Sequence, residues 1–173
     1  MKSSLADIQQ KAIDYAAIIN APQELLPTYE NSRDEFVPNI ALDTNGQLRY
    51  EIYERGQLIT NEFATDEDDL LYYIFRDISF SMAVRYEVHN RNPRQDWRRM
   101  LFAKQAELLG QLSPAWKQRV EKEKEAILKT HPFDDNSTQR LDLFDKLMKA
   151  GKTYEQAMSE ANKKFPNRNP WIS

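Results

Sequence analysis

The sequence predicts a predominantly α-helical α+β protein, with about six helices and a small antiparallel three-stranded sheet between the first helix and a central buried helix. Three observations predict this class: apolar residues recur every three or four positions, an alternating apolar run surrounds Asn45-Gly46, and residues 70–88 are mostly apolar. The 173 residues, 40% hydrophobic and 29% charged, are typical of a globular protein. We expect a single domain over 1–135, with a C-terminal helical pair over 136–173 packed on the same domain; an accessory subdomain and an oligomerisation arm are the alternatives for this pair.

The first helix is predicted over residues 5–19, where apolar residues recur at helical spacing. Ser4 and Asp7 have the spacing of a capping box at its start. The following stretch, 21–38, contains three prolines and no sustained period. It predicts a long loop.

A β-hairpin is predicted around Asn45-Gly46, because this dipeptide favours a two-residue turn in which both residues have positive φ. Its two strands are expected near 38–44 and 47–54.

A second turn, at Arg55-Gly56, leads into a third strand over 57–63. Successive side chains of the middle strand face opposite sides of the sheet, so one side should pack and the other should meet solvent or a partner. The packed side carries Leu48, Tyr50 and Ile52, and the other carries Arg49, Glu51 and Tyr53.

The central helix is predicted to begin after Thr65 and to end near Val88. Threonine can cap a helix, and the carboxylates that follow it interact favourably with the helix dipole. Apolar side chains cover nearly the whole circumference, which predicts a helix surrounded by other elements. Asp77, Ser81 and Arg85 share one stripe, for which we predict an internal Asp77–Arg85 network bridged by Ser81, or pairing with the arginines of the next helix.

Two further helices follow. Asn92, followed by proline, predicts a helix start, with Trp97 on the buried face and Gly110 near the end. The next helix begins near Pro114 and ends before Pro132.

The C-terminal pair has clear boundary signals. Gly151 closes its first helix, and Thr153 with Gln156 has capping-box spacing at the start of the second. Gly151-Lys152-Thr153 resembles the end of a phosphate-binding loop, but the second glycine and the preceding strand of such a loop are missing. We therefore predict a helix-joining turn.

The composition argues against several chemistries. The chain has no cysteine and only two histidines, His89 and His131, so we expect no metal, no cofactor and no catalytic residues. A hydrolase that uses Asp77, Ser81 and a histidine is a minor alternative. No stretch has the apolar length of a signal peptide or a membrane span, so we expect a cytoplasmic protein with no membrane partner.

The net charge of −3 hides an uneven distribution. Basic and acidic residues number 7 and 16 in residues 1–90, 10 and 5 in 91–133, and 7 and 6 in 134–173. The basic segment 91–104 contains Trp97, and it supports an alternative function as a nucleic-acid-binding regulator. The overall acidity argues against nucleic acid as the partner.

Acidic side chains gather between the middle strand of the predicted sheet and the start of the central helix. Capping and the helix dipole explain two or three of these carboxylates, and we interpret the surplus as a recognition surface with Tyr53 as an anchor. The candidate binding residues are Glu51, Tyr53, Glu54, Glu62, Asp66, Glu67, Asp68 and Asp69.

The order of three sequence motifs resembles the immunity protein 63 family. The motifs are DEDDLLYYIFRDISFSMAVRYEVHN, QDWRRMLFAKQAELLGQLSPAW and HPFDD. Members of that family are encoded beside bacterial polymorphic toxins, including those of contact-dependent growth inhibition, and neutralise them. The resemblance implies that this chain is not an enzyme and binds one cognate toxin domain, for which a nuclease is one candidate. The eight candidate residues would then contact the toxin, and the oligomeric state stays open.

Overall fold

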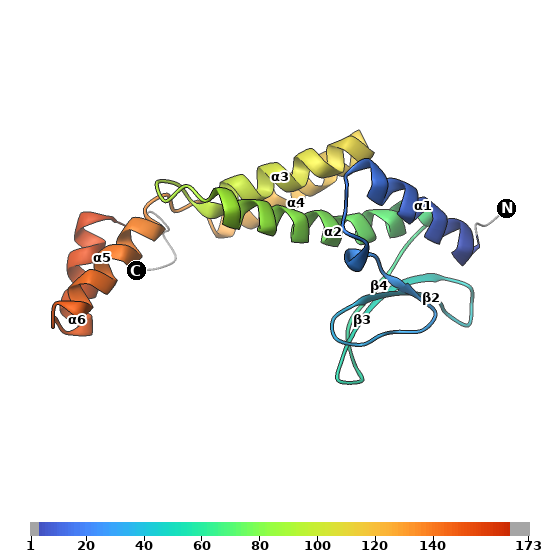
Figure 1. Ribbon diagram of the computed structural model, residues 1–173, viewed down its shortest axis with the longest axis horizontal. Helices are drawn as coiled ribbons and strands as arrows, with labels where there is room; N and C mark the ends of the chain where they lie inside the picture. Colours follow the sequence, from blue (N-terminus) through green and yellow to red (C-terminus); the bar gives the residue numbers. More distant parts are fainter. Residues whose placement is uncertain (1–3, 167–173) are drawn as a thin grey trace. The chain divides into compact units, whose positions relative to one another are not determined.

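The computed structural model describes residues 4–166, and the chain divides into two compact units. Within the described residues, the first unit comprises 4–82 and 107–117, and the second comprises 83–106 and 118–166. Three helices contribute to both units: α2 (Glu67–Asn90), α3 (Trp97–Leu112) and α4 (Pro114–Thr130) (Figure 1).

The first unit combines helical segments with a four-stranded sheet. Besides parts of α2, α3 and α4, it contains α1 (Leu5–Ile18), a short 3-10 helix η1 (Gln23–Leu25), β1 (Thr28–Tyr29), β2 (Pro38–Leu42), β3 (Leu48–Glu54) and β4 (Gln57–Phe63). The strand order is β1-β2-β3-β4, with β1 parallel to β2 and the other neighbours antiparallel. The three antiparallel strands are as predicted. A sheet of only three strands was wrong, because the expected loop over 21–38 also contributes η1 and the short strand β1.

Helix α1 begins at the predicted capping box. The Asp7 N–H donates to Ser4 Oγ at 3.2 Å, and the Ser4 N–H donates to the Asp7 carboxylate at 2.9 Å. These bonds satisfy two main-chain donors that the helix itself leaves without partners. Ile8, Ala12 and Ala16 form its buried face.

The first hairpin turn differs in type from the prediction. At Asn45-Gly46 only Gly46 has positive φ, of 73°, because the Asp43 carboxylate accepts the N–H groups two and four residues ahead at 2.8 Å and closes a longer loop. The turn with positive φ at both positions is the second one, with φ of 51° at Arg55 and 73° at Gly56. The predicted order of the three antiparallel strands is unaffected by the different first turn.

Helix α2 is capped by a different residue from the one predicted. The Asp66 carboxylate accepts the Asp69 N–H at 2.9 Å, which is the geometry of a helix cap. Thr65 instead donates its N–H and its hydroxyl to the Asp69 carboxylate, at 3.0 and 3.2 Å. Two aspartates therefore build the helix start, and threonine supports one of them.

The central helix α2 is buried mainly in its first half. Leu70 and Phe75 have no exposed surface, as expected for a helix surrounded by other elements. Phe80, Tyr86 and Val88 are 42%, 43% and 58% exposed. Burial around the whole circumference was therefore a wrong prediction for the second half, where apolar side chains lie on the surface.

An aromatic cluster belongs to the core of the first unit. The Trp116 ring stacks on Phe75 with centroids 6.1 Å apart, and Tyr15 and Tyr72 approach Trp116 edge-on. Such aromatic pairs contribute about 0.5–1.5 kcal/mol each beyond the burial of their surface. They join α1, α2 and the start of α4.

The second unit ends in two helices, α5 (Ser137–Lys149) and α6 (Tyr154–Lys164), which form a helical hairpin (Figure 1). The rings of Phe144 and Tyr154 meet at 5.3 Å between the two helices. Packing of this hairpin on residues 1–135 stays a prediction, and 167–173 lie outside the described residues.

The turn between α5 and α6 is the helix-joining turn that the sequence predicted. Gly151 has a φ of 85°, and its N–H donates to the Met148 carbonyl at 3.0 Å. The next N–H, of Lys152, donates to the Leu147 carbonyl at 3.2 Å, which completes a Schellman motif. Helix α6 then begins at the predicted capping box of Thr153 and Gln156.

The start of α3 differs from the prediction. Asn92 lies in a preceding turn, and the cap is Asp96, whose carboxylate accepts the Arg98 N–H at 2.9 Å. Trp97 was expected in the core but is 44% exposed. Helix α3 also continues through Gly110 for two more residues.

Candidate functional site

The sheet of the first unit has two different faces, as the alternation of β3 predicts. On one face Tyr50 is fully buried and donates its hydroxyl to the Asp77 carboxylate of α2. The other face carries Arg49 and Glu51, and the Arg49 guanidinium lies 5.6 Å from the centre of the Phe63 ring of β4. The face turned away from α2 therefore combines charged and aromatic side chains.

Glu51, a predicted binding residue, is held by its neighbours on this face. Its side chain is 6% exposed and lies 3.2 Å from Arg49. Its carboxylate also accepts hydrogen bonds from the Tyr53 hydroxyl at 3.2 Å and the Asn39 amide at 3.5 Å. Burial and the Glu51 charge raise the pKa of the Tyr53 hydroxyl. Glu51 thus positions Arg49 and Tyr53.

Glu62 belongs to an ion-pair network on the opposite face. Its two carboxylate oxygens accept from the two terminal nitrogens of Arg76 at 2.7 and 3.1 Å, a bidentate pair. The Nε of Arg76 donates to Asp77 at 2.9 Å. Tyr50 also belongs to this network, because its hydroxyl donates to the Asp77 carboxylate. Burial and the Asp77 charge raise the pKa of Tyr50. Asp77 therefore belongs to a network with Arg76, Glu62 and Tyr50, which the sequence did not identify as its partners. The predicted bridge through Ser81 to Arg85 stays a prediction.

The carboxylates at the start of α2 also have internal partners. Glu67 forms an ion pair with Lys11 of α1, and Asp68 accepts the Trp116 indole N–H at 3.1 Å. Asp66 and Asp69 build the helix cap described above. Asp66 and Asp68 are nevertheless exposed, so their outer surface can also face a partner.

Strand β4 carries the most exposed apolar side chains of the sheet's long strands, and it lies at the edge of the sheet. Leu58, Ile59 and Phe63 are 44%, 54% and 46% exposed. None of these three was predicted as a site residue. Their apolar character points to a core from sequence alone, whereas their place on an edge strand becomes visible only with the sheet order. Exposed apolar side chains on an edge strand are a feature of surfaces that bind another chain.

A cavity of about 500 Å³ opens in the first unit and bears on the hydrolase alternative. Its lining includes Tyr50, Asp77 and Ser81 and contains no histidine. The Nδ1 of His89 contacts a main-chain carbonyl one turn back at 2.7 Å, and that of His131 lies 2.9 Å from the neighbouring threonine hydroxyl. The Asp, Ser and His arrangement needed for a serine nucleophile does not occur in this lining.

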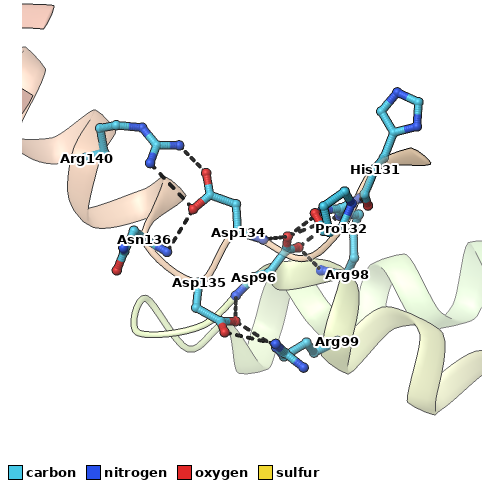
Figure 2. A network of polar contacts seen from close by, with 9 residues as sticks. All are labelled: Asp96, Arg98, Arg99, His131, Pro132, Asp134, Asp135, Asn136 and Arg140. Carbon is cyan, nitrogen blue, oxygen red and sulfur yellow. Dashed lines mark hydrogen bonds and ion pairs between the residues drawn. The ribbon is translucent and has the colours of Figure 1, made fainter. Parts of the chain in front are cut away.

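The basic segment 91–104 forms part of an acidic and basic network in the second unit (Figure 2). Arg98 forms a bidentate ion pair with Asp96, with nitrogen to oxygen distances of 3.0 and 2.6 Å, and also donates to the main-chain carbonyls of His131 and Pro132. Asp96 additionally accepts the Asp134 N–H at 2.7 Å. The network thus connects the start of α3 to the segment after α4.

Two more arginines of this segment are also engaged. Arg99 forms a bidentate pair with Asp135 at 2.7 and 2.9 Å, and Arg91 pairs with the buried Glu87 at 2.7 and 2.8 Å. Figure 2 shows the Asp134 carboxylate pointing toward Arg140 of α5, with which it forms an ion pair. The HPFDD motif therefore has a structural role, because its two aspartates fix Arg99 and Arg140 and its main chain binds Arg98.

Within residues 4–166, no helix is long and apolar enough to cross a membrane. An edge strand with exposed apolar side chains, followed by an acidic helix start, is a surface typical of proteins that bind other proteins.

The family of the chain follows from comparison with known proteins. Residues 44–126 match the family described as Immunity protein 63, which confirms the resemblance seen in the sequence motifs. The matched segment, 83 of the 173 residues, runs from the first hairpin turn to most of α4. The HPFDD motif lies beyond the matched residues. No curated protein and no solved structure matches the chain.

Proposed function

We propose that this chain is an immunity protein that binds one cognate bacterial toxin domain directly and neutralises it in the cytoplasm, without catalysing a reaction. The family match over residues 44–126 carries this proposal, because it covers β3, β4 and the acidic start of α2. A toxin inhibitor needs a recognition surface and no reactive group, and these elements supply such a surface.

The proposed contact surface keeps the eight predicted residues but gives them two roles. Glu51, Glu62, Glu67 and Asp69 hold the surface in shape through the internal contacts described above. The other four, which reach the toxin, are Tyr53, Glu54, Asp66 and Asp68.

Charge supports a basic partner. Residues 44–69 contain seven acidic and two basic side chains, a net charge of −5. Such a surface accelerates encounter with a positively charged protein and adds specificity. A nuclease has a basic substrate-binding surface, so an acidic inhibitor can cover or flank it by presenting negative charge in place of phosphate.

Nucleic-acid binding through the segment 91–104 is the second candidate. The exposed Trp97 favours it, since an exposed indole can stack on a base. The ion pairs of Arg91, Arg98 and Arg99 disfavour it, because phosphate would have to replace carboxylates already bound to them.

A co-expression experiment tests the proposed function. The chain is placed in cells that make the toxin domain encoded beside its gene, and a tagged copy is recovered from the survivors. Growth together with a stoichiometric complex is the expected result. Cell death in the presence of folded chain, with no recovered complex, would refute it.

Charge reversal tests the electrostatic part separately. Glu54 is the best position, because its nearest basic partner, Arg55, is 3.9 Å away and its replacement disturbs little else. Glu54→Lys should slow association about three- to tenfold at low salt and less at high salt. The matched control is Glu155→Lys at the exposed start of α6, which should leave the association rate unchanged.

A further inference from the structure

Strand β4 is the long free edge of the sheet. The strand order places β1 and β4 at the two edges, and β1 has only two residues whereas β4 has seven. Within residues 4–166 no strand other than β3 pairs with β4. An edge strand presents a row of unpaired N–H and C=O groups, which is a template for another strand.

The hydrogen-bond pattern identifies which main-chain groups of β4 point outward. The Ala64 N–H donates to the Leu48 carbonyl at 3.0 Å, so these opposed residues form a hydrogen-bonded pair. Hydrogen-bonded and non-hydrogen-bonded pairs alternate along an antiparallel ladder. Phe63 and Asn61 therefore occupy non-hydrogen-bonded positions opposite β3, and their N–H and C=O groups face the outer edge.

The edge lacks most of the features that prevent strands from pairing. Residues 57–63 contain no proline, lysine or arginine. Their only charged side chain, Glu62, is bound by Arg76 of α2. A register shift between Ile52 and Tyr53 of β3 is the one irregularity in the β3–β4 ladder. The strand also exposes the three apolar side chains named above.

Charge indicates what occupies this edge. Glu54 lies before β4, and four carboxylates, Asp66, Glu67, Asp68 and Asp69, follow it. In a parallel pair of two copies the four carboxylates of each chain would meet, and in an antiparallel pair they would meet Glu54 with its neighbour Arg55, so self-pairing brings little complementary charge. A strand with basic residues at its ends is complementary instead.

We propose that the cognate toxin domain adds an extended, basic-flanked strand to the outer edge of β4, through main-chain hydrogen bonds at Asn61 and Phe63. This inference rests on the proposed function and names the mode of binding. Main-chain pairing supplies affinity, and contacts with Leu58, Ile59 and Phe63 supply specificity.

Amide hydrogen exchange of the unmodified chain, resolved by residue, tests the inference without any mutation. In the free protein the amides of Thr60 and Glu62 should exchange slowly and those of Asn61 and Phe63 fast. Binding of the toxin domain encoded beside the gene should slow Asn61 and Phe63 at least about tenfold. If a stable complex forms and these two amides stay fast, the inference is wrong while the proposed function stands.

A variant pair gives an independent test. Asn61→Pro removes one outward N–H, and proline is tolerated on edge strands at such positions. It should weaken toxin binding about 30- to 100-fold, the loss expected from one main-chain hydrogen bond together with a steric clash between the proline ring and the added strand. The control Asn61→Thr keeps the N–H and should stay within about threefold of the unmodified chain. Equal affinities of the two folded variants would overturn the inference.

Two further results distinguish strand addition by the toxin from self-pairing of β4 and from failure of the proposed function. If the free chain is a dimer in size-exclusion chromatography and Leu58→Lys makes it monomeric, a second copy occupies the edge and the inference fails. If the active toxin domain neither binds the chain nor is neutralised by it, the proposed function fails, and the inference fails with it.

Discussion

Replacement of Asp96 by alanine should destabilise the second unit more than any other single change in the network of Figure 2. The Asp96 side chain is 3% exposed and serves as helix cap, ion-pair partner and acceptor for a distant main-chain group. Its removal leaves the N–H groups of Arg98 and Asp134 without these acceptors, at about 1 kcal/mol each. It also takes the bidentate partner from Arg98, which is 20% exposed.

Loss of one member of a buried pair costs about 3–5 kcal/mol, but Arg98 keeps its bonds to the carbonyls of His131 and Pro132. We therefore expect the free energy of unfolding to fall by about 3–4 kcal/mol in total for Asp96→Ala. The measurement is urea denaturation at neutral pH, followed by circular dichroism and by amide exchange in the second unit.

The matched control is Asp135→Ala. Its partner Arg99 is 43% exposed and Asp135 itself is 47% exposed, so solvent screens this ion pair. Asp135 also accepts the Asp96 main-chain N–H at 2.9 Å, so the expected loss is about 1–2 kcal/mol in total. If Asp96→Ala costs no more than Asp135→Ala, the network does not stabilise the second unit as argued.

Three further predictions concern stability. Burial alone would raise the pKa of Asp96, but hydrogen bonds from Arg98 and from the main chain outweigh it and lower this pKa. Because the pKa is lower in the folded state, the ionised carboxylate stabilises the fold above the unfolded pKa of about 3.9, and this stability is lost as pH falls through the folded pKa. The unfolding free energies of the unmodified chain and of Asp96→Asn should therefore converge in acid titrations. A difference between them that widens below pH ~4 would contradict this. Gly151→Ala should cost about 1 kcal/mol in thermal unfolding because of the positive φ, even though the added methyl has space, and an unchanged melting temperature would argue against the described turn. Asp68→Ala should red-shift the fluorescence of buried Trp116 and cost about 1–2 kcal/mol, since its indole N–H loses an acceptor; identical spectra would refute the contact.

Features encoded within a few residues were predictable from the sequence. The capping boxes at Ser4 and Thr153 and the turn at Gly151 need only local geometry, and the structure has all three. The third antiparallel strand followed from a turn signal and an apolar run. The α+β class rests on these local features, so it is correct in the structure.

Features that depend on distant partners were not predictable. Strand β1 has two residues and becomes a strand only through parallel pairing with β2. Asn92 and Asp96 are both suitable helix caps, and the bond from the distant Asp134 N–H favours the second. Trp97 has the spacing of a buried residue, but the start of α3 leaves it exposed.

The candidate site also combines features that local sequence predicts with features that depend on distant partners. Acidic residues were recognisable as a group, whereas their internal partners Lys11, Arg76 and Trp116 come from other elements. The exposed apolar side chains of β4 could be assigned to an edge only once the neighbours of that strand were known.

Titration of the purified toxin domain with the purified chain shows whether the chain neutralises the toxin by binding it directly. The toxin domain is the one encoded beside the gene of this chain, and its activity is measured against increasing amounts of the chain. Direct neutralisation predicts a linear fall in activity that reaches zero at one chain per toxin domain. Full activity of the toxin in a tenfold excess of folded chain would contradict it.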